Sequence, residues 1–147
     1  MRAAWHVVAG ALLFSGCSKV CTLAGCIDGL EIVLSATGHV GASPLPAGEY
    51  VISVTLDGVA NTTTCAIGST PLRCTGATST LSVGSGGSNI FVDISSDPIK
   101  SATITVTRDG VELVSRDFKP NYHAFSPNGP ECEPTCMEAS ENIALSL

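Results

Sequence analysis

Apolar and polar residues alternate with a period of two along much of the chain after residue 29. In Leu30–Ser35, every second residue is a leucine or an isoleucine. This period buries one side of a β-strand and leaves the other side toward solvent. Similar patterns predict further strands, which are Tyr50–Leu56, Thr62–Ile67, Ser79–Val83, Ile90–Ile94 and a short last strand in Asn142–Leu147.

The clearest hairpin signal is Ala102–Arg116. Its first half alternates Ala, Ile and Val with threonine, and Asp109-Gly110 supplies the positive φ angles of a type I′ turn. The apolar positions change phase near Val114, which predicts a β-bulge or a strand end there. Cys136–Ala144 is the only candidate for a helix, and it is brief.

Seven to eight short strands rich in Val, Ile and Thr predict an all-β fold, an immunoglobulin-like β-sandwich, with a small β-barrel as the alternative. Pro46-Ala47-Gly48-Glu49-Tyr50 supports the sandwich, because it resembles the P-x-G-x-Y sequence at the start of a strand in many immunoglobulin-like bacterial surface domains. Gly38–Gly48, with its two prolines, predicts a loop, and Gly84–Ser88 predicts a flexible one.

The extreme N-terminus has a different character. Arg2 precedes the apolar run Val7–Phe14, and small residues follow, which is the organisation of a secretory signal. The run is too short to span a bilayer, which takes about 20 apolar residues. Leu13-Phe14-Ser15-Gly16-Cys17 resembles the lipobox of bacterial lipoproteins. The resemblance implies that residues 1–16 are removed and that Cys17 is lipidated, on the extracytoplasmic side of a membrane in the bacterial cell envelope.

The lipoprotein resemblance also divides the chain. It implies a signal peptide at 1–16, a lipidated cysteine with a short tether at 17–20, and a single domain at 21–147. Only three residues separate Cys17 from Cys21, so if Cys21 is bonded into the fold, the domain is tied within about 13 Å of the bilayer. Ser18 follows the lipidated cysteine, and in a Gram-negative cell this implies the outer membrane rather than the inner one.

The cysteine count agrees with lipidation. The chain has seven cysteines, and an odd number in an exported protein leaves one thiol to explain. If Cys17 carries lipid, six remain, the number for three disulfides in an oxidising compartment. Cys65 and Cys74 are nine residues apart, and we expect them to close a local loop, at about 2.5–3 kcal/mol.

The other four cysteines lie near the two ends of the domain, and they are Cys21, Cys26, Cys132 and Cys136. Either each pair closes on itself or the pairs join the termini, and we favour the second arrangement without choosing partners. The turn Pro127–Pro130 is suited to bring Cys132 back toward the N-terminus. The alternative to disulfides is a zinc site in which these four cysteines are thiolate ligands, and an oxidising compartment disfavours it.

The segment Pro127-Asn128-Gly129-Pro130-Glu131-Cys132-Glu133-Pro134-Thr135-Cys136 resembles the C-terminal signature of small, cysteine-rich β-sandwich lipoproteins. This resemblance implies no activity. The formal charge is −6, and loss of Arg2 with the signal brings it to −7. Such a charge opposes binding to nucleic acid or to anionic lipid headgroups, so membrane attachment is expected through the lipid on Cys17.

No residue pattern predicts catalysis. Gly84–Ser88 contains serines and glycines but does not join a strand to a helix, as a nucleophile elbow does. His39 and His123 are expected in solvent-exposed loops, although His123 with Glu131 or Glu133 is a candidate for metal binding. We therefore expect a non-enzymatic module without a cofactor, which contacts a protein or another envelope component. A small metal-binding lipoprotein with cysteine and histidine ligands is the alternative.

Overall fold

The computed structural model describes residues 21, 24–36, 44–68, 72–78, 80–86 and 88–147, which form ten β-strands and no helix. The strands are β1 (Gly29–Ser35), β2 (Gly48–Leu56), β3 (Val59–Ile67), β4 (Arg73–Thr75), β5 (Leu81–Gly86), β6 (Asn89–Ser95), β7 (Ala102–Arg108), β8 (Val111–Phe118), β9 (His123–Phe125) and β10 (Cys136–Ala144). The predicted signal peptide, Cys17, its tether and His39 lie outside the described residues.

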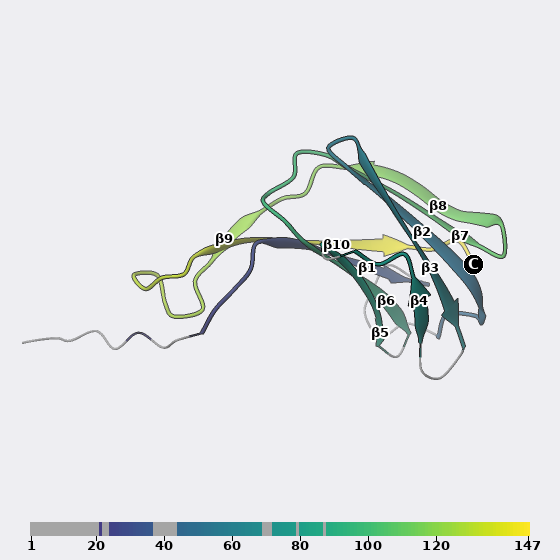
Figure 1. Ribbon diagram of the computed structural model, residues 1–147, viewed down its shortest axis with the longest axis horizontal. Coiled ribbons are helices and arrows are strands. Elements are labelled where there is room, and N and C mark those ends of the chain that lie inside the picture. Colours follow the sequence, from purple (N-terminus) through teal and green to yellow (C-terminus); the bar gives the residue numbers. More distant parts are fainter. Residues whose placement is uncertain (1–20, 22–23, 37–43, 69–71, 79, 87) are drawn as a thin grey trace, which may run out of the picture.

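The ten strands form two five-stranded sheets. One has the order β5-β6-β1-β10-β9, and the other has the order β4-β3-β2-β7-β8 (Figure 1). In the part of the chain that the structure describes, no strand of one sheet pairs with a strand of the other. The predicted β-sandwich is therefore confirmed, and the alternative of a closed barrel is wrong.

The strand order also explains the immunoglobulin-like character. In a variable-type immunoglobulin domain, strands D-E-B-A face strands C″-C′-C-F-G. The runs β5-β6-β1 and β4-β3-β2-β7-β8 match D-E-B and C″-C′-C-F-G in order and in antiparallel pairing. The place of strand A is taken by β10, which pairs parallel with β1 from Gly29↔Glu138 to Ser35↔Ala144. The first and last of the described strands thus lie side by side within this sheet.

The core lies between the two sheets and follows the predicted alternation. Its fully buried side chains are Leu30, Ile32, Leu34, Tyr50, Ile52, Ile90, Ile94, Ile104 and Ile143, with Val54, Val92 and Val106. Tyr50 brings a hydroxyl into this apolar layer, where an unpaired polar group is costly. Its hydroxyl donates to the carbonyl oxygen of Pro46 at 2.9 Å. This bond satisfies the buried hydroxyl of Tyr50 with a backbone carbonyl just before β2.

Two Asp-Gly turns join the strands of the second sheet. Asp109 and Gly110 have φ angles of 50° and 82°, and Asp57 and Gly58 have 45° and 90°, as a type I′ turn requires. The predicted bulge in the second hairpin is confirmed. Val106 pairs with Val114 and Thr107 pairs with Glu112, so Leu113 is the additional residue.

The C-terminal segment corrects two predictions. Cys136–Ala144 is the strand β10 and not a helix, and the last strand ends at Ala144 instead of covering Asn142–Leu147. The buried positions Cys136, Ala139 and Ile143 are spaced as in a helix, although only the last two face the core. Cys136 lies on the opposite face and is buried with its disulfide to Cys26.

Glu141 also interrupts the alternating pattern that would predict β10. It is a charged residue at a position in line with Ala139 and Ile143, whose side chains face the core. Its carboxylate is 3.7 Å from the guanidinium of Arg116 on β8, and the two side chains are 23% and 46% exposed. The carboxylate at this position therefore keeps contact with solvent, and the ion pair adds a modest attraction.

Some smaller boundaries also differ from the predicted ones. β5 continues to Gly86, so most of the predicted flexible loop Gly84–Ser88 is strand. The three-residue strands β4 and β9, at sheet edges, have too few residues to show a period, and they raise the number of strands from the predicted seven to eight to ten.

Candidate functional site

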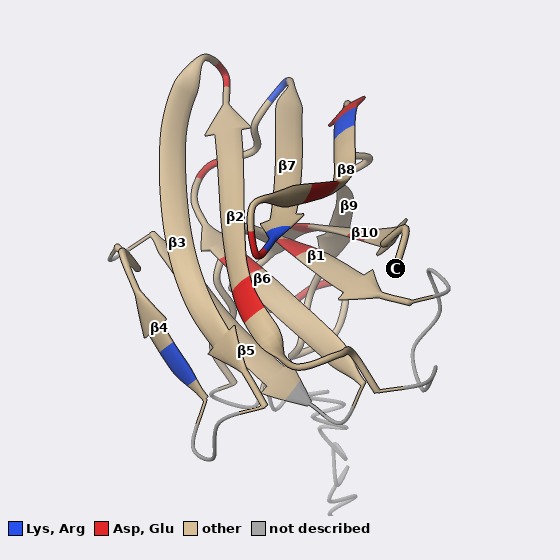
Figure 2. Cartoon of the chain, turned by 90° about the vertical axis from the view of Figure 1, so that its right-hand side faces the viewer, with Lys and Arg blue, Asp and Glu red and all other residues tan. Residues whose placement is uncertain are grey.

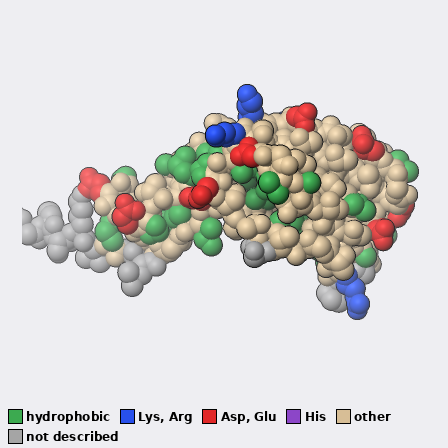
Figure 3. Space-filling model, turned by 45° about the horizontal axis from the view of Figure 1, so that its top comes forward, with side chains coloured by type: hydrophobic (Ala, Val, Ile, Leu, Met, Phe, Trp, Pro, Cys, Tyr) green, Lys and Arg blue, Asp and Glu red, His purple; other side chains and the backbone are tan. Residues whose placement is uncertain are grey.

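A narrow extension projects from one end of the sandwich and contains both chain segments with the paired cysteines (Figure 1). We call it the stalk and define it as Cys21, residues 24–28 and residues 123–137. Figure 3 shows the same extension with hydrophobic and acidic side chains on its surface. The turn between β7 and β8 lies at the opposite end of the molecule.

Two disulfides join the N-terminal and C-terminal parts of the stalk. Cys21 is bonded to Cys132 and Cys26 to Cys136, across 111 and 110 residues. The predicted connection of the two termini is therefore the observed one. Closing a loop of about 100 residues is nominally worth about 5 kcal/mol, but the second bond closes a loop already closed by the first. The main effect of the second bond is local, because it links the two segments of the stalk at a second position.

Asn128 forms a third connection between the two segments. Its side-chain oxygen accepts a hydrogen bond from the backbone N–H of Ala24 at 3.1 Å. Its side-chain nitrogen donates to the backbone oxygens of Ala24 and Glu133, at 2.9 and 2.7 Å. Gly129, with a φ of 97°, completes the turn and accepts a bond from the N–H of Cys132 at 3.1 Å. The Asn-Gly turn thus directs Cys132 toward the N-terminal segment, as its sequence predicts.

The third disulfide is local, as predicted. Cys65 on β3 and Cys74 on β4 face each other in the sheet register, and their sulfur atoms are bonded. Cys65 is completely buried. This bond attaches the short edge strand β4 to the sandwich, at some distance along the chain from the stalk.

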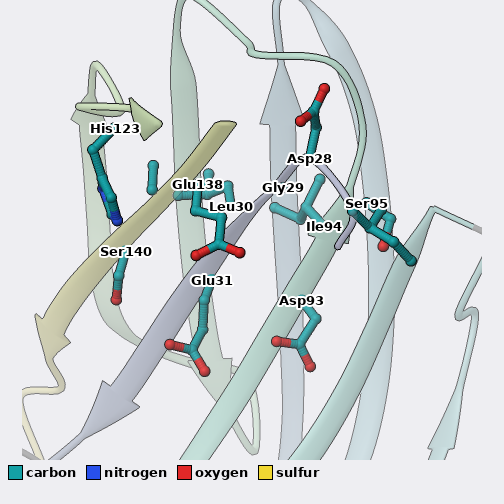
Figure 4. Close-up of a pocket in the computed structure, with 12 residues that line it drawn as sticks. Asp28, Gly29, Leu30, Glu31, Asp93, Ile94, Ser95, His123, Glu138 and Ser140 are labelled. Atoms are coloured by element: carbon teal, nitrogen blue, oxygen red, sulfur yellow. The ribbon is translucent and has the colours of Figure 1, made fainter. Parts of the chain in front are cut away.

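A shallow pocket of about 340 Å³ lies beside the stalk, on the outer face of the sheet that contains β1. It is open to solvent and spans β6, β1, β10 and β9 (Figure 4). Its lining includes Ile27, Asp28, Glu31, Asp93, His123, Glu138 and Ser140. Gly29 forms part of the lining, and a Cβ atom there would lie 2.8 Å from the backbone oxygen of Ile94. A glycine is therefore needed where the pocket begins.

The pocket is acidic because of strand register. Glu31 and Asp93 are directly opposite each other on β1 and β6, and Figure 4 shows their carboxylates side by side. Glu138 is beside Gly29 in the parallel pair, and His123 is opposite Glu138 on β9. The sequence does not indicate this cluster, since its members come from four strands and the β1/β10 pairing is between the ends of the chain.

One carboxylate of the pocket has a structural role. Asp28 accepts a hydrogen bond from the backbone N–H of Met137 at 2.7 Å, which joins the base of the stalk to β10. Among the described residues, no group of three or more His, Cys, Asp and Glu side chains is arranged to hold a metal ion. The structure places His123 opposite Glu138 in the register of β9 and β10. The six described cysteines are all disulfide-bonded, so none of them supplies a thiolate.

Another carboxylate, at the β2–β3 turn, holds two segments of the second sheet together. Asp57 accepts hydrogen bonds from the backbone N–H groups of Lys100, at 3.0 Å, and Ser101, at 2.9 Å. These bonds, first that from Lys100 and then that from Ser101, lower the pKa of Asp57 below its ordinary value of 3.8. The sequence shows Asp57 as a turn residue, but the contact with residues more than forty positions later is visible only in the structure.

Basic residues are few, and Figure 2 shows them at separate places on the fold. None of the described segments forms a helix long and apolar enough to cross a membrane. Comparison of the chain with protein-family models, with curated proteins and with solved structures gives no match.

Proposed function

We propose that the protein is a lipid-anchored module of the bacterial cell envelope, which holds a rigid β-sandwich outside the cytoplasm for contact with another protein or envelope component. The observation that carries this proposal is the bond between Cys21 and Cys132. It attaches the chain to the folded domain four positions after Cys17, the residue in the lipobox-like sequence.

The disulfides support the extracytoplasmic location that the proposal requires. Three bonds use all six cysteines other than Cys17, and disulfides persist in oxidising compartments outside the cytoplasm. They leave Cys17 as the remaining thiol, which is the group that a lipoprotein modifies. The metal-binding alternative receives less support, because the thiols that it would use are paired with each other.

The position of the stalk supports a defined orientation. A lipid on Cys17 would hold Cys21, and with it the stalk, within about 13 Å of the bilayer. The β7–β8 turn lies at the end of the sandwich away from the stalk (Figure 1). Val111, beside this turn, is 65% exposed and is free to meet a partner away from the membrane. The role in this proposal is therefore contact, not chemical conversion.

The proposal is tested on the full-length protein expressed in a bacterium, with Cys17→Ala compared with the neighbouring Ser18→Ala. We expect Cys17→Ala to leave the domain folded but to move it from the membrane fraction to the soluble fraction. Ser18→Ala should remain in the membrane fraction. Intact mass of the detergent-extracted wild-type protein should show acyl chains and no residues before Cys17. A membrane-bound Cys17→Ala variant, or a wild-type mass without acyl chains, would contradict the proposal.

A further inference from the structure

The two disulfides of the stalk differ in accessibility. Cys21 is exposed and Cys132 is half-buried. In each of the other two bonds, one partner is buried, since Cys136 is 5% exposed and Cys65 is 0% exposed. The Cys21–Cys132 bond is also the outer of the two bonds in the stalk, because Cys21 precedes Cys26 on the N-terminal segment.

Thiol–disulfide exchange requires a thiolate to reach one sulfur atom of the bond, so its rate depends on access. We propose that the Cys21–Cys132 bond is a site of exchange with an extracytoplasmic dithiol, which opens it before the other two bonds and leaves the sandwich folded. The partner is identified by its chemistry alone, as a reductant with two thiols that form an internal disulfide.

Accessibility decides which sulfur is attacked, because Cys21 is exposed and Cys132 is half-buried. The first thiolate of the dithiol therefore attacks the sulfur of Cys21 and displaces Cys132 as a thiolate, which takes up a proton. The second thiol then loses its proton and attacks the reductant's own sulfur in the mixed disulfide, which releases Cys21. The protein gains two electrons and two protons, and the dithiol becomes a disulfide.

The remaining contacts of the stalk do not depend on the outer bond. Cys26 stays bonded to Cys136, and Asp28 stays hydrogen-bonded to the N–H of Met137. Both contacts reach the first two residues of β10, Cys136 and Met137, and so hold the N-terminal segment where the pairing of β1 with β10 starts. Opening the outer bond thus changes the tether and the tip of the stalk while the domain remains intact.

The consequence at the membrane rests on the proposed function, since it requires lipid on Cys17. With the outer bond closed, four residue steps connect Cys17 to the fold, a reach of about 13 Å. With it open, the hydrogen bonds between Asn128 and Ala24 are the next attachment, seven steps from Cys17, and the reach is about 23 Å. When these bonds break as well, the next attachment is Cys26, nine steps away, and the reach is about 30 Å. Exchange at this one bond would therefore allow the domain to move roughly twice as far from the bilayer.

The order of opening is tested on the full-length protein in detergent. Samples are incubated with a fixed low concentration of dithiothreitol, quenched by alkylation at successive times, digested and analysed by mass spectrometry. We expect Cys21 and Cys132 to become alkylated about ten-fold faster than the other four cysteines. Faster opening of either other bond, or opening of all three at the same rate, would overturn the proposal. A double variant Cys21→Ser/Cys132→Ser should leave the reduction rates of the other four cysteines unchanged.

The change in reach needs a second measurement, on vesicles of phosphatidylcholine that contain an acceptor dye. A donor fluorophore is placed at Val111 as a non-natural amino acid, and energy transfer is measured before and after selective opening of the outer bond. We expect transfer to fall on opening, and to be low from the start in the Cys21→Ser/Cys132→Ser variant. Unchanged transfer on bound protein would refute the longer reach. Failure to bind vesicles would instead refute lipid anchoring and leave the order of opening standing.

Discussion

Asn128 holds the backbone of Ala24, 104 residues earlier in the chain, through two hydrogen bonds. Its side-chain oxygen accepts from the N–H of Ala24 at 3.1 Å, and its side-chain nitrogen donates to the oxygen of Ala24 at 2.9 Å. An amide is the one side-chain group that offers a donor and an acceptor side by side to a peptide backbone. Position 128 therefore requires an amide side chain for these two hydrogen bonds, and not only a residue that is suited to the turn.

Asn128→Asp should weaken the stalk, although the two side chains have nearly the same shape. The carboxylate keeps the acceptor for Ala24 but points its second oxygen at the backbone oxygens of Ala24 and Glu133. Loss of the donor should lower the free energy of unfolding by about 0.5–1.5 kcal/mol. Chemical denaturation measures the change, and Asn142→Asp, at an exposed position of β10, is the matched control. Equal stability of the two variants would show that the Asn128 contacts do not stabilise the fold.

Removal of the local disulfide with Cys65→Ser/Cys74→Ser should leave a folded but less stable protein. The bond closes a loop of nine residues between β3 and β4, and such a closure is worth about 2.5–3 kcal/mol. Urea denaturation of the variant and the wild-type protein gives the difference. The predicted loss should be absent if both proteins are first fully reduced. A wild-type midpoint in the oxidised variant would mean that the bond does not stabilise the protein.

The parts of this fold that the sequence predicts are those determined by neighbouring residues. The Asp109-Gly110 turn needs only two residues with positive φ, and β1 and β2 need only an alternating pattern. The local Cys65–Cys74 bond also lies within one hairpin-like segment. In each case, the residues that determine the feature lie within about ten positions of one another.

The parts that could not be predicted depend on residues more than twenty positions away. β10 contains a carboxylate in its core-facing set, and Glu141 there stays partly exposed and lies 3.7 Å from Arg116 of the other sheet. The outward Cys136 is buried because Cys26, from the other end of the chain, is bonded to it. The acidic pocket likewise requires the parallel pairing of β1 with β10, and no local pattern identifies such a partner.

Asp57 should make the stability of the domain depend on pH in acid. Backbone hydrogen bonds from Lys100 and Ser101 lower its pKa in the folded state. The stabilisation is therefore fully present above the unfolded pKa of about 3.9 and is lost as the pH falls through the lower folded value. Thermal unfolding from about pH 5 to pH 2 should show a smaller drop in midpoint for Asp57→Asn than for wild type. Glu112→Gln, at an exposed site on β8, is the control. Parallel curves for wild type and Asp57→Asn would contradict this assignment.

The acidic pocket should lower the stability of the domain, because Glu31 and Asp93 place like charges directly opposite each other on β1 and β6. Such a pair is unfavourable by several tenths of a kcal/mol, whereas opposite charges at the same positions attract. Glu31→Lys should thus raise the free energy of unfolding by about 0.2–1 kcal/mol in low salt, and Glu31→Gln should raise it by less.

The dependence on salt separates this electrostatic effect from a change in packing. Exposed charges are screened at high ionic strength, so the gain from Glu31→Lys should shrink between about 0.01 M and 1 M sodium chloride. The double variant Glu31→Lys/Asp93→Asn should keep only the smaller gain that comes from removing the repulsion, as Glu31→Gln does, because the new lysine then has no carboxylate directly opposite it. Urea denaturation at both salt concentrations measures each variant. A gain that is independent of salt, or the absence of any gain in Glu31→Gln and in the double variant, would mean that the two carboxylates do not repel each other across the strands.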